Sequence, residues 1–127
     1  MMAWRSEYDD LIRQAREMIA ARHKPGWHHV GCALRTRSGK TFAAVHLEAY
    51  VGRVAVCAEA VGIGMAAAAG DTDLEAIVAV SRDGKIVSPC GMCRELIADY
   101  APECLVIVGE GEAVPISALL PRKYVRD

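Results

Sequence analysis

Large aromatic side chains are scarce in this sequence of 127 residues, since phenylalanine, tryptophan and tyrosine make up only 6% of it. A core with so few aromatic residues must be built from valine, isoleucine, leucine and alanine. No apolar run reaches the roughly 20 residues that a transmembrane helix requires, so we expect no membrane partner. Residues 1–12 are mixed polar and acidic and do not resemble a signal peptide, which predicts a cytoplasmic location.

Neither sign of charge dominates, because 15 basic and 16 acidic residues give a formal net charge of -1. A protein that binds a nucleic acid polymer usually has a basic excess or a basic stripe, so a small-molecule ligand is expected instead. The length suits one globular domain over residues 1–127. Five cysteines in a chain expected in the cytoplasm indicate metal binding or catalysis before disulfides.

Hydrophobic periodicity and turn residues predict a chain in which helices and strands alternate. Apolar side chains at three- and four-residue steps predict a helix over 8–21, and β-rich runs predict a hairpin of strands 30–36 and 41–46. The same signals predict further helices over 57–69 and 89–100, buried strands over 75–80 and 105–108, and a helical turn over 116–120. Two strand–helix–strand passages require part of the sheet to be parallel, which favours a three-layer α/β/α sandwich.

Three cysteines and one glutamate lie in two short segments, Cys57-Ala58-Glu59 and Pro89-Cys90-Gly91-Met92-Cys93, at expected helix starts. The three-residue spacing lets Cys90 and Cys93 face one point, and the positive end of a helix dipole lowers thiol pKa values. Three thiolates on one Zn²⁺ leave the fourth tetrahedral position for water, as in catalytic sites. Glu59 would lie beside the metal, in a position to move protons.

Two other interpretations of these cysteines are open at this point. Cys90 and Cys93 alone match a redox pair, and with Cys57 they match a structural zinc site whose fourth ligand is a residue such as His46 or Cys104. A redox pair gives no role to Cys57, and a structural site needs no carboxylate beside the metal. The presence of a glutamate two residues after the first cysteine therefore favours a catalytic zinc site.

The ligand-x-Glu and Pro-Cys-x-x-Cys segments together match a signature of zinc deaminases. The chain resembles the cytidine deaminase superfamily, in particular its small three-cysteine branch, which includes cytidine deaminase and blasticidin S deaminase. The resemblance covers about residues 30–124 and includes the segments Val30-Gly31-Cys32-Ala33-Leu34, Ser88-Pro89-Cys90-Gly91-Met92-Cys93-Arg94 and Leu119-Leu120-Pro121. It implies a three-layer α/β/α sandwich around a mixed five-stranded sheet. It also implies one Zn²⁺ per chain bound by Cys57, Cys90 and Cys93, with Glu59 as the proton shuttle.

The activity that this resemblance implies is hydrolytic deamination of a cytosine-like nucleoside or base to the uracil-like product and ammonia. One alternative keeps the same machinery but acts on another amino-heterocycle, such as blasticidin S or a modified nucleoside. An alternative from another class is a non-catalytic structural-zinc or redox protein. Small enzymes of this branch usually form tetramers whose pockets are completed by neighbouring subunits, so the resemblance also implies a homotetramer.

Several substrate-side positions depart from the family pattern. Relatives that take nucleosides carry an Asn-x-Glu motif eleven residues before the first cysteine, where this chain has His46-Leu47-Glu48. The resemblance implies a ribose contact for Glu48 and a hydrogen bond from His46. His28 stands where relatives have a base-stacking phenylalanine, and Tyr124 stands where they place an aromatic side chain that closes the pocket.

An arginine often follows the Cys-Ala-Glu triplet in this branch, but Ala60 occupies that position here. Three thiolates on Zn²⁺ make the site negative, which works against ionising a bound water. Hydrogen-bond donors beside the metal ligands usually offset this negative charge. Arg94, which directly follows Cys93, is therefore the candidate for withdrawing charge from the sulfurs.

Overall fold

The computed structural model describes residues 4–127, so the expected domain over 1–127 begins three residues before the described part. The elements are α1 (Ser6–Arg22), β1 (Val30–Thr36), β2 (Thr41–Val45), the 3₁₀ helix η1 (Gly52–Val54), α2 (Ala58–Ala68), β3 (Leu74–Ser81), β4 (Ile86–Val87), α3 (Gly91–Tyr100), β5 (Leu105–Gly109), β6 (Glu112–Pro115) and the 3₁₀ helix η2 (Ile116–Leu119). Over residues 4–127, no helix combines the length and hydrophobicity needed to cross a membrane.

The sheet has the strand order β2-β1-β3-β5-β6, with the short β4 paired to β3 in addition. Strands β3 and β5 are parallel, as the α3 crossover between them requires, and the other pairs are antiparallel. The mixed sheet is therefore confirmed, and its central path has the expected five strands. The residue pattern alone predicted neither β4 nor β6.

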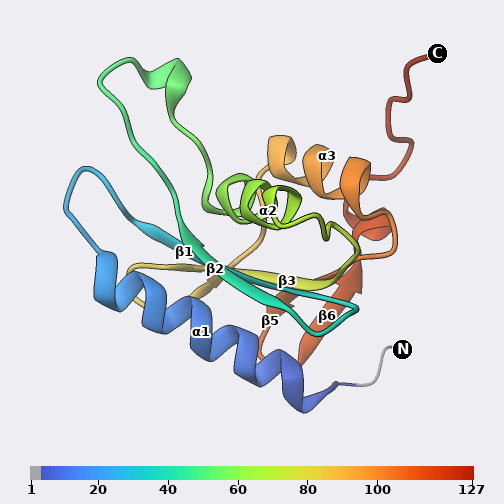
Figure 1. The fold of residues 1–127 in the computed structure, drawn as a ribbon, viewed down its shortest axis with the longest axis horizontal. Coiled ribbons are helices and arrows are strands. Elements are labelled where there is room, and N and C mark those ends of the chain that lie inside the picture. The colour runs from blue at the N-terminus through green and yellow to red at the C-terminus, as the bar shows by residue number, and fades with distance from the viewer. Residues whose placement is uncertain (1–3) are drawn as a thin grey trace.

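Helices cover both faces of the sheet, with α1 on one face and α2 and α3 on the other (Figure 1). Side chains of β1 alternate between the two layers, because successive residues of a strand point to opposite faces. Cys32 and Leu34 belong to the core under α2 and α3, whereas Ala33 belongs to the core under α1. The three-layer arrangement expected from the sequence is thus present.

Gly31 allows α1 to lie unusually close to β1. A Cβ atom at Gly31 would stand 2.6 Å from the carbonyl oxygen of Ala15 and 2.9 Å from Cβ of Ile19. We expect Gly31→Ala to lower the free energy of unfolding by about 1–3 kcal/mol, the usual cost of overpacking, as measured by urea denaturation. Gly64→Ala is the control, because a Cβ there meets no atom within 4 Å. Equal losses in the two variants would contradict this account of the α1–β1 contact.

Candidate active site

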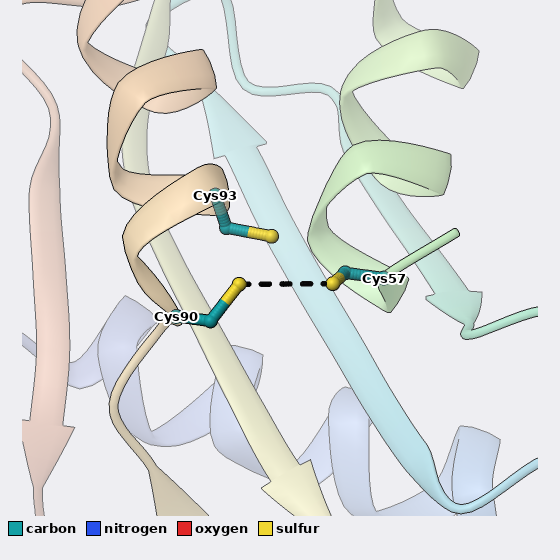
Figure 2. Close-up of side chains that lie close together, drawn as sticks. All are labelled: Cys57, Cys90 and Cys93. Carbon is teal, nitrogen blue, oxygen red and sulfur yellow. Dashed lines mark hydrogen bonds between the residues drawn. The ribbon is translucent and has the colours of Figure 1, made fainter. Parts of the chain in front are cut away.

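Two helix N-termini meet on the α2/α3 face of the sheet and bring three cysteines together (Figure 2). Cys57 directly precedes α2, Cys90 directly precedes α3, and Cys93 lies in the first turn of α3. Both helices thus begin later than expected, since Cys57 and Cys90 have extended backbone conformations and act as N-caps. The positive helix ends therefore point toward the sulfurs.

The spacing of the three sulfur atoms fits a zinc ion. All three lie within 4.8 Å of one another, and the Sγ atoms of Cys57 and Cys90 are 3.8 Å apart. Two thiolates bound to one tetrahedral Zn²⁺ at about 2.3 Å would themselves lie about 3.8 Å apart. The donor chemistry and the geometry of this cluster agree, so the residues fit the metal that the sequence predicts.

The three thiols differ in how readily they ionise. Burial raises the pKa of Cys57 and of Cys93, and the nearby Glu59 carboxylate adds to the rise at Cys93. At Cys90 the effect of burial is outweighed by hydrogen bonds from the backbone N–H groups of Cys93 and Met92 and from the neighbouring thiols, so its pKa is lowered. Because metal binding requires thiolates, binding of zinc would displace protons from these thiol groups.

Glu59 lies in the first turn of α2 and is only 6% exposed. Glu59 lines the same pocket as Cys57 and Cys90. Burial raises the pKa of Glu59, although its own backbone N–H and the Cys93 thiol act against that rise. A buried carboxyl group whose pKa lies above its ordinary value holds a proton more readily than an exposed one, which suits a group that accepts and returns a proton.

A pocket of about 270 Å³ opens beside the cysteines. Much of its wall is apolar and comes from Val30, Val56 and Val87, and Ser88 also lines it. Apolar walls with a few polar groups are typical of sites for small molecules. Val87 and Ser88 were not among the predicted site residues; the only sequence signal for Ser88 is its place just before Pro89 and Cys90.

Of the four predicted substrate residues, His46 alone is among the residues that line this pocket. It follows the last residue of β2, and a bridge between Leu47 and Val56 joins the segment after it to the segment before Cys57. His46 thus lines the same pocket as Cys57, which lies eleven positions further along the chain.

The other three predicted substrate residues do not line this pocket. The Glu48 carboxylate accepts a hydrogen bond of 3.0 Å from the N–H of Ala49. Nδ1 of His28 lies 2.9 Å from the carbonyl oxygen of His46. Tyr124 is 77% exposed and lines a separate hollow beside α3. Roles for Glu48, His28 and Tyr124 toward the substrate stay predictions.

The Arg94 guanidinium contacts backbone and hydroxyl oxygens. Its Nε donates to the carbonyl oxygen of Pro89 at 2.8 Å and its Nη1 to that of Leu119 at 3.1 Å. Its Nη2 donates to the Ser88 hydroxyl at 3.1 Å. These bonds join the segment that leads into Cys90 to the end of η2. Arg94 therefore holds residues 88–89 in place beside Cys90, and its predicted withdrawal of charge from the sulfurs stays a prediction.

Replacing Arg94 with alanine removes all three of these hydrogen bonds. We expect the free energy of unfolding to fall by about 1–3 kcal/mol and zinc to be lost to a chelator faster than from the wild type. Urea denaturation and chelator competition measure the two effects. Arg82→Ala, in an exposed turn, is the matched control. If the Arg94 variant keeps both its stability and its rate of zinc release, the positioning role is wrong.

Comparisons with known sequences agree with the site. Residues 5–109 match the family model described as the cytidine and deoxycytidylate deaminase zinc-binding region. The chain is 46% identical to a blasticidin-S deaminase of Bacillus cereus, with 93% of this chain and 92% of the relative covered. It is 27% identical to a cytidine deaminase of Halalkalibacterium halodurans, with 92% and 93% covered.

Solved structures share the fold. A cytidine deaminase from Mycobacterium leprae has a TM-score of 0.83 and 28% identity, with 93% of this chain and all (100%) of that chain covered. A cytidine deaminase from Burkholderia pseudomallei has a TM-score of 0.79 and 26% identity, with 92% and 98% covered. The family match and the cysteine cluster together indicate one Zn²⁺ per chain. The chain belongs to the cytidine and deoxycytidylate deaminase family, and it is a zinc-dependent enzyme that removes an amino group hydrolytically from a small molecule.

Proposed function

We propose that the enzyme acts on a cytosine-bearing compound and releases ammonia and the uracil-like product. The observation that carries the proposal is the placement of Glu59 in one pocket with Cys57 and Cys90. The valine-rich walls of this pocket suit a flat heterocycle, because such a ring buries apolar surface on both faces. The overall reaction consumes one water and replaces the amino group of the ring with a carbonyl oxygen.

In this proposal Cys57, Cys90 and Cys93 hold the zinc, which when bound supplies Lewis-acid activation of water. Glu59 takes a proton from the attacking water and delivers it to a ring nitrogen of the substrate, which makes the neighbouring amino-bearing carbon electrophilic as the hydroxide adds to it. Glu59 then takes the proton of the newly added hydroxyl group and delivers it to the departing amine, so that the carbonyl oxygen forms and ammonia leaves as a neutral molecule. Burial of Glu59 supports this shuttle, because it keeps bulk water away from the transferred proton.

The names of two relatives give two candidate substrates, which are blasticidin S and cytidine. The sequence identity to the blasticidin-S deaminase, 46%, is much greater than the 27% identity to the cytidine deaminase. His46 also replaces the asparagine expected of enzymes that take nucleosides. These two observations make blasticidin S the first compound to test, with the cytosine nucleosides beside it.

The test is ammonia release by purified, zinc-loaded protein. The panel comprises cytosine, cytidine, deoxycytidine, their monophosphates, blasticidin S and several aminopurines, and Glu59→Gln protein serves as the blank. We expect turnover of blasticidin S or a cytosine nucleoside and none of the aminopurines. Turnover of aminopurines alone, or of no compound at one zinc per chain, would contradict the proposal.

We also propose that the enzyme is a homo-oligomer, and specifically a tetramer as in its branch of the family. The loop between β2 and α2 projects from the body of the molecule (Figure 1) and exposes Tyr50, Val51 and Val54. Met92 is also exposed, at the start of α3, and a second copy of the chain would bury such apolar surface. Light scattering should give four times the chain mass of 13.7 kDa; a monomer would contradict this.

The five cysteines are unpaired, which supports the predicted cytoplasmic location.

A further inference from the structure

One ring nitrogen of His46 is fully engaged by the backbone. Nδ1 of His46 accepts hydrogen bonds from the N–H of His29 at 2.9 Å and from the N–H of Val30 at 3.3 Å. A ring nitrogen that accepts hydrogen bonds carries no proton, so the neutral ring must hold its proton on Nε2. The hydrogen-bond network thus assigns a single tautomer to His46.

The neighbours of His46 also fix the position of the ring. Its own backbone N–H donates to the carbonyl oxygen of Val30 at 3.1 Å, and its carbonyl oxygen lies 2.9 Å from Nδ1 of His28. Because a carbonyl oxygen can only accept, His28 donates in that bond. The ring of His29 is stacked on that of His46, with centroids 5.4 Å apart. Rotation of the His46 ring would break the two hydrogen bonds to Nδ1 and the stacking on His29.

The surroundings keep this ring uncharged. Burial lowers the pKa of His46, the rings of His29 and His28 lower it further, and the Glu48 carboxylate acts in the opposite direction. The net effect is a pKa below the ordinary value of histidine, so the neutral form is favoured at neutral pH. A neutral ring with Nδ1 engaged offers one donor at Nε2 and no acceptor, whereas an asparagine side chain offers both.

We propose that His46 determines specificity by presenting this fixed Nε2–H donor to the pocket, and that it selects cytosine compounds with an acceptor oxygen at this wall. The inference rests on the proposed function, because it concerns the substrate of the same pocket. His46 lines that pocket together with Cys57 and Glu59. A substrate with an ammonium or amide N–H at this wall would leave two donors facing each other, which costs binding free energy.

Nitrogen NMR tests the tautomer without turnover, on zinc-loaded Glu59→Gln protein labelled with ¹⁵N-histidine. We expect the proton on Nε2 of His46 and none on Nδ1 at pH 7, above the ordinary histidine pKa of about 6.5. Loss of the signal in His46→Asn protein assigns it. The Nε2–H resonance should shift when excess cytidine or blasticidin S is added. A proton on Nδ1, or no shift with a compound that the wild type deaminates, would overturn the proposal.

Two amide variants separate the roles of the two ring nitrogens. Asparagine can accept the backbone N–H bonds in place of Nδ1 but is too short to reach the position of Nε2, whereas glutamine can place an amide N–H near that position. We expect His46→Asn to raise the KM of blasticidin S about tenfold with little change in kcat, and His46→Gln to recover part of the loss. Arg82→Asn, in an exposed turn outside the pocket, is the control.

An unchanged KM in His46→Asn protein would overturn the proposed role of His46 in specificity. Failure of the proposed function has a different signature, because the wild type would then release no ammonia from any panel compound. In that case the NMR measurement still decides which ring nitrogen of His46 carries the proton. The two failures are therefore distinguishable.

Discussion

Glu59→Gln is expected to lower kcat about 10²–10⁴-fold, the range that a positioned acid–base group usually contributes. Glutamine has nearly the same shape as glutamate but cannot accept a proton and return it. Because Glu59 is not one of the three sulfur ligands, the variant should still hold one zinc per chain. Ammonia release under saturating substrate measures kcat, and elemental analysis measures the zinc content.

The matched control for this variant is Glu103→Gln, which neutralises an exposed carboxylate outside the pocket. That control should keep wild-type turnover. If Glu59→Gln protein retained near-normal kcat with full zinc content, the proton shuttle would have to be another group. If it lost zinc as well as activity, the loss of turnover would say nothing specific about proton transfer.

Cys93→Ser is expected to lose most of its zinc and, with it, its turnover. Serine presents a hydroxyl that stays protonated where the metal requires a thiolate. Loss of an outer partner of a metal ligand costs about 10–100-fold in affinity, so loss of a ligand should cost more than about 100-fold. Chelator competition measures this affinity, and the zinc content after dialysis gives an independent reading.

Zinc also stabilises the folded state that binds it, so the thermal midpoint of the Cys93 variant should fall and should no longer respond to added zinc. Cys104→Ala is the control, because Cys104 is buried in the core and is not part of the sulfur cluster. It should keep one zinc per chain. Full zinc occupancy in Cys93→Ser protein would show that Cys93 is not a ligand.

Local patterns in the sequence were enough to place most of the helices and strands. The strand over 30–36 has the predicted bounds, and α1 extends beyond the predicted 8–21 by two residues at the start and one at the end. Such elements are predictable because their apolar periodicity reflects which face is buried. The two cysteine segments were recognisable for a similar reason, since a ligand spacing on a helix start is a short-range property.

Two strands were not predicted because their sequences carry only a weak strand pattern. Strand β4 has two residues, Ile86 and Val87, which is too short for any periodicity, and it exists through its pairing with β3. Among residues 4–127, strand β6 pairs only with β5, and it ends at Pro115, a residue that normally argues against a strand inside a sheet. Their formation depends on the partner strand more than on their own residues. The consequence for the site is that the Val87 wall of the pocket could not be predicted.

The sequence by itself thus determined the class of fold and the three cysteines that form the metal cluster, because helix periodicity and ligand spacing are properties of short segments. Only the tertiary structure decided which side chains meet. His46 lines the pocket and Glu48 does not, since the Leu47–Val56 bridge sets how the chain returns toward Cys57. Arg94 binds the carbonyl oxygen of Leu119, 25 residues away, rather than sulfur. Such contacts depend on strand register and loop closure, which join distant segments and leave no trace in local composition.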